Sequence, residues 1–343
     1  MNKTVRKRLG DVTVVGFGSQ GRAQAVRLRA AGVAVTVGLP PRSRSRAVAR
    51  GDGFAVTTPA RAVAGCSTVA LLAPDRVAGR VLGDLAGSLE AGCLVVFAAG
   101  YPLHFPQAPT PPDCDIVLVA PHGPGSRLAG GVPMSGFVGV HQDVSGQAMQ
   151  RARAYARAIG LAPLYESTIR QEALGDLFGE QALLCGGLLG LTAAVAEEMI
   201  RRGIPPANAF YETTAQLESL AALLAERGVH GFWEEISDCA AAGSARAAPC
   251  LFGRQFSDAL RAVWDDVESG RFARAFQRQG RPKTLPAKWR VLDKAAAAAR
   301  EVSSGRKLPS PTGKRRSAAD GKGGKAQSPT KARRSSSAGR RGR

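Results

Sequence analysis

Cysteine and histidine are scarce in this sequence, and neither is spaced for a disulfide framework or a zinc site. The 343 residues include six cysteines and four histidines, with no C-x-x-C and no H-x-x-x-H pair. Such spacings mark structural zinc sites and redox motifs. Their absence excludes these classes, and the cysteines, which stand mostly in apolar runs, are expected to be reduced and buried.

Long apolar runs are also missing. The first residues, MNKTVRKRLG, lack the apolar stretch of roughly 7 to 15 residues that a signal peptide needs. The most apolar later run, residues 181–196, is shorter than the roughly 18 to 20 residues that cross a membrane, and Glu180 and Glu197 flank it. We therefore expect a soluble, cytoplasmic protein with no membrane partner.

Acidic residues are almost absent from the end of the chain. After Ser304 there are thirteen Lys and Arg residues and one acid, Asp320, so this segment carries +12 of the formal net charge of +20. It contains PSPTGKRR and QSPTKARR but no aromatic residue that would stack on bases. Such a tail can bind a nucleic acid or another polyanion through phosphate contacts, or it can simply solubilise the protein.

The rest of the chain divides into two halves. Residues 12–38 read as strand, turn, helix and strand, and further apolar runs follow at residues 67–74, 93–100 and 115–121. Strands buried on both faces of a parallel sheet have this continuous apolar pattern. We predict a doubly wound α/β domain over 1–167, an all-helical domain over 168–301 and a disordered basic tail over 302–343.

A glycine-rich turn follows the first strand. Gly16, Gly18 and Gly21 form G-F-G-S-Q-G at the start of a helix, where free backbone N–H groups suit a pyrophosphate. The alternative is a glycine-rich turn without a ligand. No acid follows the second strand to bind a ribose hydroxyl; the segment 39–46 instead supplies serines and arginines, which suit a 2′-phosphate. This favours NADPH over NADH, unless Arg42, Arg44 and Arg46 are only a solvated loop.

Two carboxylates four residues apart indicate a metal site in the helical half. Asp176 and Glu180 lie on one face of a helix amid apolar residues, and Glu212 and Gln216 repeat the spacing. Such a pair is most often a solvated helix face. Buried carboxylates without a partner are costly, however, and Mg2+ is held by oxygen ligands of this kind.

Several motifs together resemble the short-form ketol-acid reductoisomerase family over roughly residues 10 to 300. They are VVGFGSQGRAQA, the S-x-S at Ser43 and Ser45, VAPHGPG, VHQDVSGQA, DLFGEQALLCGG and ISDCAAAG. The resemblance implies a Rossmann domain and a knotted helical domain that pairs in a homodimer. It also implies an NADPH-dependent, two-Mg2+ oxidoreductase of branched-chain amino acid synthesis. Its substrate would be a 2-hydroxy-3-keto acid of the 2-acetolactate type, which undergoes alkyl migration and then reduction.

The resemblance also implies roles for individual residues. Asp176 matches the metal-bridging aspartate, Glu180 and Glu212 match metal-site glutamates, and Ser237 matches the serine that touches the substrate carboxylate. The implied cofactor residues are Gly16, Phe17, Gly18, Ser19, Gln20, Gly21, Ser43, Ser45, Asp75 and Gly125.

Four positions depart from the family pattern. Ala99 replaces a histidine, His122 a lysine, Gln216 a glutamate and Pro40 an arginine. Ala99 cannot transfer a proton, Gln216 removes a negative charge from the metal site, and His122 can still donate a hydrogen bond. The expected catalytic set is His122, Asp176, Glu180 and Ser237. The alternatives are a catalytically weakened or repurposed homologue, or a scaffold that binds a polyanion through its tail.

Overall fold

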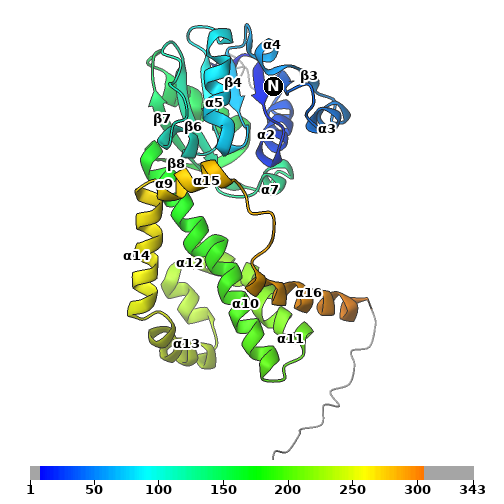
Figure 1. The fold of residues 1–343 in the computed structure, drawn as a ribbon, viewed down its shortest axis with the longest axis vertical. Coiled ribbons are helices and arrows are strands. Elements are labelled where there is room, and N and C mark those ends of the chain that lie inside the picture. Colours follow the sequence, from blue (N-terminus) through cyan, green and yellow to red (C-terminus); the bar gives the residue numbers. More distant parts are fainter. Residues whose placement is uncertain (1–7, 305–343) are drawn as a thin grey trace, which may run out of the picture. The chain divides into compact units, whose positions relative to one another are not determined.

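A single eight-stranded sheet organises the first half of the chain in this computed structural model, which describes residues 8–304 (Figure 1). The strand order is β3-β2-β1-β4-β5-β6-β7-β8, and all neighbours are parallel except β6 and β7. The bounds are β1 Val12–Val15, β2 Val35–Gly38, β3 Ala55–Thr57, β4 Thr68–Leu71, β5 Leu94–Phe97, β6 Asp115–Pro121, β7 Met134–Gln142 and β8 Leu161–Glu166.

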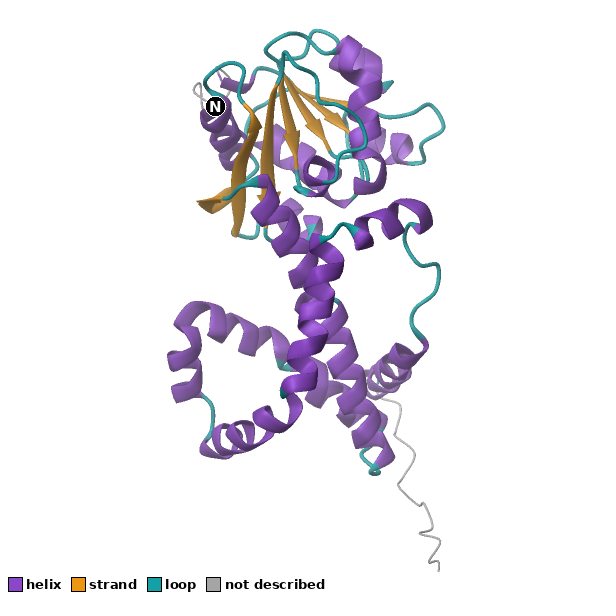
Figure 2. Cartoon of the chain, turned by 60° about the vertical axis from the view of Figure 1, so that its left-hand side comes forward, coloured by secondary structure: helices purple, strands orange, loops and turns teal. Residues whose placement is uncertain are grey.

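Helices cover both faces of this sheet (Figure 2). They are α2 Ser19–Ala30, α3 Ser45–Gly51, α4 Pro59–Val63, α5 Asp75–Leu85, α6 Tyr101–His104, α7 Gly125–Ala129 and α8 Ala148–Ala158. The buried residues form two apolar clusters, and successive residues of a strand belong to different ones. Val14 and Val96 belong to the first cluster, and Val15 and Val95 belong to the second. The prediction of strands buried on both faces is therefore confirmed.

The sequence patterns do not predict β3, β7 or β8. β7 pairs antiparallel with β6, and its buried residues alternate with half-buried ones along part of its length, so it has no continuous apolar run. β3 has three residues, of which Ala55 is exposed. β8 lies at an edge of the sheet, contains Pro163 and has only one fully buried residue, Leu161. An edge strand with this little burial has no continuous apolar run, so the pattern used for the other strands does not detect it.

The second half is entirely helical, as predicted. Its elements are α9 Ile169–Gly179, a π-helical turn at Glu180–Leu184, α10 Gly186–Arg201, α11 Pro206–Phe210, a second π-helical turn at Tyr211–Ala215, α12 Leu217–Glu235, α13 Asp238–Leu251, α14 Arg254–Glu268, α15 Arg271–Gln279 and α16 Arg290–Ser303. Gly228 has a positive φ of 67° and kinks α12. A doubly wound sheet followed by a helical half is thus the observed fold.

Contacts group the chain up to Ala299 into one unit and place Arg300 onward in another. The predicted disordered tail lies outside the described residues from 305 on. Residues 169–201 form a 33-residue helical stretch whose most apolar 18-residue window has a mean hydropathy of 1.6. Only 11% of that window is buried. By length and composition alone it could cross a membrane, because the helical stretch, with its π-helical turn, extends well beyond the apolar run that the sequence shows.

Candidate active site

The predicted phosphate loop connects β1 to α2. Gly16 has a φ of 102°, and a Cβ there would lie 2.4 Å from the carbonyl oxygen of Leu72, so only glycine fits. A Cβ on Gly18 would meet nothing within 4 Å, so this residue borders open space. Gly18 is also the N-cap of α2 and provides no side-chain cap. The first N–H groups of α2 are therefore available to an anion.

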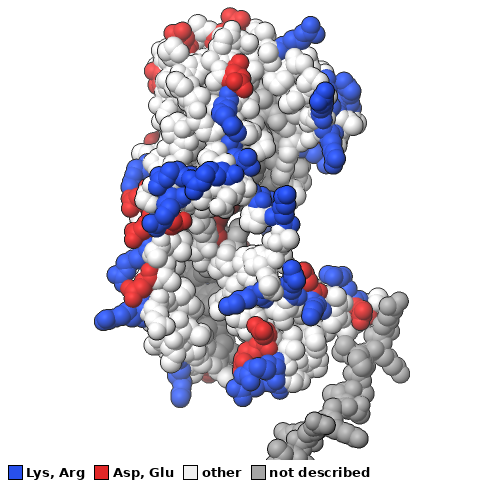
Figure 3. Space-filling model, viewed as in Figure 1, with Lys and Arg blue, Asp and Glu red and all other residues white. Residues whose placement is uncertain are grey.

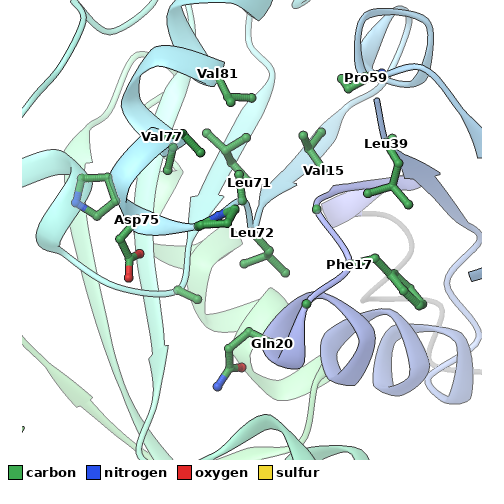
Figure 4. A pocket seen from close by; sticks show the side chains of 18 of the residues that line it. Val15, Phe17, Gln20, Leu39, Pro59, Leu71, Leu72, Asp75, Val77 and Val81 are labelled. Carbon is green, nitrogen blue, oxygen red and sulfur yellow. The ribbon is translucent and has the colours of Figure 1, made fainter. Parts of the chain in front are cut away.

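A cavity of about 770 Å³ opens beside this loop, at the carboxyl ends of β1, β2, β4 and β5 (Figure 4). This is the switch point of a doubly wound sheet, where the strand order reverses and nucleotides bind. Most predicted cofactor residues line the cavity: Gly16, Phe17, Gly18, Ser19, Gln20, Ser43, Ser45 and Asp75.

The remaining two predicted cofactor residues lie just behind the cavity. A Cβ on Gly21 would be 2.3 Å from the carbonyl oxygen of Gly16, and one on Gly125 would be 2.4 Å from that of Ser19. Both glycines therefore allow close backbone packing around the loop. They shape the cavity without lining it.

The three arginines after β2 differ in their placement. Arg46 donates from Nη1 to the carbonyl oxygens of Leu39 (2.7 Å) and Thr57 (3.1 Å). It therefore holds the loop together. Arg42 and Arg44 are exposed. Ser43 and Ser45 line the cavity, whereas the three arginines are not among its lining residues.

Four carboxyl groups influence one another next to the cavity. Asp176 and Glu180 are exposed in this chain, so the expectation that they are buried is wrong. Partial desolvation still raises the pKa of each, and the charge of Asp176 raises the pKa of Glu180 further. Asp75, at the start of α5, also has a pKa raised by partial desolvation and by Asp176. Asp75 lines the cavity as well, so the carboxylate cluster and the nucleotide cavity are adjacent.

Glu172 is the member of this cluster that the sequence reasoning missed. Its side chain is only 4% exposed, and its Oε2 accepts a 2.6 Å hydrogen bond from the backbone N–H of Gly100. Burial, followed by the charge of Asp176, raises its pKa to about 8. Its spacing offered a signal: Glu172, Asp176 and Glu180 repeat every four residues along one helix face.

His122 lies in the loop between β6 and α7 and faces this cluster. Its Nδ1 is 2.9 Å from Oγ of Ser135, and its ring contacts Phe137 edge-on at 4.3 Å and stacks on Tyr165 at 6.5 Å. Burial lowers the pKa of His122, and the charge of Asp176 partly opposes this. His122 and Glu180 each interact electrostatically with Asp176, so the structure places both near that residue.

Comparison with known families shows which family the chain belongs to. Residues 8–164 match the NADPH-binding domain of acetohydroxy acid isomeroreductase, and residues 169–310 match the C-terminal domain of ketol-acid reductoisomerase. The chain belongs to the ketol-acid reductoisomerase family. The fold and the match to a cofactor domain support an oxidoreductase built for a nicotinamide cofactor.

Solved structures agree with this assignment. A ketol-acid reductoisomerase from an uncultured archean, described as NADH-preferring, is 27% identical, with a TM-score of 0.76 over 90% of this chain and 97% of its own. A semialdehyde dehydrogenase NAD-binding protein from Cupriavidus necator (20% identity, TM-score 0.60) and a putative oxidoreductase from Jannaschia sp. CCS1 (15%, 0.58) each match 76% of this chain and 98% of theirs. These two support the fold alone.

The family motif DLFGEQALLCGG has a physical explanation here. The π-helical turn at Glu180–Leu184 brings the carbonyl oxygen of Gln181 to 2.2 Å from a Cβ placed on Gly186. The carbonyl oxygen of Ala182 would lie 2.0 Å from a Cβ on Gly187. The paired glycines are therefore required by the wide turn, which itself begins at a site carboxylate.

Three predicted site residues are not joined to the cluster. Glu212 lies in the second π-helical turn, Gln216 follows it, and Ser237 caps α13 by accepting a 3.3 Å hydrogen bond from Ala240 N–H. Glu212 is not among the charges that perturb Asp176 or Glu180. Within residues 8–304 no three His, Cys, Asp or Glu side chains are arranged to hold a metal ion.

Proposed function

We propose that this chain is an NADPH- and Mg2+-dependent ketol-acid reductoisomerase that acts on 2-acetolactate-type 2-hydroxy-3-keto acids, as in branched-chain amino acid synthesis. One observation carries the proposal: Asp75 lines the nucleotide cavity, and its charge also raises the pKa of Glu172 and of Glu180. A substrate bound at the carboxylates would thus lie next to a cofactor in the cavity. Family membership supplies the reaction type.

The test is NADPH oxidation with 2-acetolactate and Mg2+, followed by absorbance. Asp176→Asn is expected to abolish turnover, because it removes the central carboxylate of the cluster. The matched control is Asp258→Asn, which changes an exposed aspartate on α14. Unchanged turnover in Asp176→Asn would overturn the proposal.

Preference for NADPH is supported by the loop after β2. Ser43 and Ser45 line the cavity, Arg42 and Arg44 are exposed, and residues 39–46 contain no acid that would bind a ribose 2′-hydroxyl. The test is fluorescence titration with both cofactors. Ser45→Asp places a negative charge where the 2′-phosphate would lie, so it should weaken NADPH binding more than NADH binding. Equal affinities in the unmodified chain would contradict the preference.

The metal assignment rests on the chemistry of the donors. Asp176 and Glu180 carry oxygen ligands. Partial desolvation raises the pKa of both, the charges of Asp176 and Asp75 raise that of Glu180 further, and a dication would offset these effects. Bound Mg2+ would act as a Lewis acid on the substrate oxygens. Further ligands must come from elsewhere, and we assign Glu212 and Gln216 of a second copy to this role. Mg2+ should raise the unfolding temperature of the unmodified chain but not of Asp176→Asn.

Homodimerisation through residues 168–301 is supported by the surface of the helical half. Leu183, Leu184, Leu191 and Trp233 are 46–66% exposed, and uncharged surface separates the charged groups there (Figure 3). Exposed apolar area of this kind marks an interface. We assign the apolar 169–201 stretch to this contact and not to a membrane. Light scattering of Leu184→Glu should show a monomer, whereas the unmodified chain should be a dimer.

A second candidate function is a weakened or repurposed homologue, and one observation favours it. Ala99, which lines the cavity, offers only a methyl group where the family pattern has a histidine. General acid or base groups contribute about 10² to 10⁴ in rate. Ala99→His with Gln216→Glu tests this reading: activity that appears only after these changes supports a decayed site, whereas activity before them supports the enzyme.

The basic tail carries a third, separate proposal, binding of a nucleic acid or another polyanion. Its sequence favours phosphate contacts, whose strength falls steeply with salt. The full-length chain and one ending at Glu301 can be compared for DNA binding at low salt. If the two chains bind DNA equally, the tail is not the binding segment. If they turn over substrate equally, catalysis does not need the tail.

A further inference from the structure

A line of three hydrogen bonds, one buried and two partly buried, runs from α8 to the loop after β6. The hydroxyl of Tyr155, on α8, donates to Oε1 of Gln24 at 2.8 Å. Nε2 of Gln24 donates to Oε1 of Gln20 at 3.2 Å, and Nε2 of Gln20 donates to the carbonyl oxygen of Gly123 at 3.2 Å. Tyr155 and Gln24 are both fully buried. The line therefore begins in the core and ends in the loop that carries His122.

The carbonyl of Gly123 fixes the direction of every bond in this line. A carbonyl oxygen only accepts, so Gln20 must present its amide N–H2 to Gly123 and its oxygen to Gln24. Gln24 must then present its N–H2 to Gln20 and its oxygen to Tyr155. Each side chain is thus held in one orientation, and the phenol of Tyr155 supplies the first proton.

The two ends of this line belong to different parts of the candidate active site. Gln20 lines the nucleotide cavity and is in the first turn of α2 (Figure 4). Gly123 follows His122, which faces the carboxylate cluster. The two segments also touch directly, because a Cβ on Gly125 would lie 2.4 Å from the carbonyl oxygen of Ser19. A small movement of either segment would therefore move the other.

We propose that Tyr155 and Gln24 are positioning residues: through Gln20 they hold the cofactor loop and the His122 loop in one relative arrangement. Neither residue reaches the cavity itself. Their role deepens the proposed function and rests on it for the step from loop position to turnover. Cofactor binding and loop order can be measured without turnover.

The competing explanation is that these bonds only satisfy polar groups in a core. Both explanations predict a loss of stability when one partner is removed, because the other is left buried without a hydrogen bond. They differ in what happens when both partners become apolar. Tyr155→Phe with Gln24→Met should recover the stability lost at the Tyr155–Gln24 bond, since replacing both partners is nearly neutral. Oε1 of Gln20, which loses its bond from Gln24, is only partly buried and can accept from water instead. Only the positioning explanation predicts that the cofactor loop and the His122 loop remain less ordered in the double variant.

The experiment uses the full-length chain and compares Tyr155→Phe, the double variant and Thr68→Val. Thr68 is the matched control, because its hydroxyl is fully buried and donates a 2.7 Å bond to the carbonyl of Leu9, away from both loops. Thermal unfolding, NADPH titration and hydrogen exchange of residues 122–131 are measured on each. For Tyr155→Phe and the double variant we expect about tenfold weaker NADPH binding and about tenfold faster exchange, the size of one lost hydrogen bond.

Two results would overturn the inference. One is NADPH affinity and loop exchange that return to normal in the double variant along with stability. The other is a loss of NADPH affinity and a rise in loop exchange in Thr68→Val as large as those in Tyr155→Phe. If the unmodified chain binds no nicotinamide cofactor, the proposed function fails, and the exchange of residues 122–131 still decides whether Tyr155 and Gln24 hold the loop.

Discussion

The buried carboxyl of Glu172 should make the protein less stable as the pH rises. Its pKa is 4.5 ordinarily and about 8 in the folded chain, a difference of 3.5. Between these values the folded state retains a proton that the unfolded state has lost, so stability is full below pH 4.5 and decreases as the pH rises through 8. At 1.36 kcal/mol for each pKa unit, the upper bound is about 5 kcal/mol, and relaxation around the charge should reduce it to about 2 kcal/mol.

Glu172→Gln isolates this contribution. The amide keeps the shape of the side chain and an oxygen that can accept from Gly100 N–H, but it cannot ionise. The free energy of unfolding in urea, measured from pH 5 to 8.5 with a chelator present, should fall by about 2 to 5 kcal/mol more in the unmodified chain than in the variant. A smaller slope should remain, because partial desolvation also raises the pKa values of Asp75, Asp176 and Glu180.

The matched control is Glu226→Gln, which alters an exposed glutamate on α12 and should leave the slope unchanged. Parallel curves for the unmodified chain and Glu172→Gln would refute the reasoning. They would mean that the proton on Glu172 is lost at the same pH in the folded and unfolded states.

Three further predictions concern stability and are checked by urea unfolding. Thr168→Ala removes the capping box at the start of α9 and should cost about 1 kcal/mol; no loss would mean the cap is replaced by water. Arg151→Met removes the charged partner of the fully buried Asp115, which keeps hydrogen bonds from Val144 and Ser145, and should cost about 1.5 to 3 kcal/mol, a loss that Asp115→Asn in the same chain should partly reverse. Gly186→Ala should cost about 1 to 3 kcal/mol, because its Cβ would meet a carbonyl at 2.2 Å. Gly190→Ala on the same helix has open space and should gain about 0.5 to 1 kcal/mol, and equal effects would contradict the requirement for glycine in the turn.

The nucleotide half of the site was predictable because its determinants are local. Gly16 and Gly18 lie within one turn between a strand and a helix, so spacing and context sufficed. The same holds for Asp176 and Glu180, whose four-residue spacing places them on one helix face. In each case the sequence neighbours that define the feature are also its spatial neighbours.

The rest of the site depends on contacts between distant segments. Glu172 is distinguished by a bond to Gly100, and the ring of His122 is held by Ser135 on the next strand. Arg46 looked available to a phosphate but is bound to backbone carbonyls. No local pattern reports such pairings, because they depend on how the strands are ordered in the sheet.

The π-helical turn at Glu180–Leu184 has a consequence for how the chain can change in length. It connects the carboxylate face of α9 to the apolar face of α10 without a break in the helix. Deleting one residue there would restore regular helix but rotate everything after it by about 100°, since a turn takes 3.6 residues. The carboxylates and the exposed leucines would then no longer keep their angular relation. Insertions and deletions are thus costly in this stretch even where each individual side chain could be substituted.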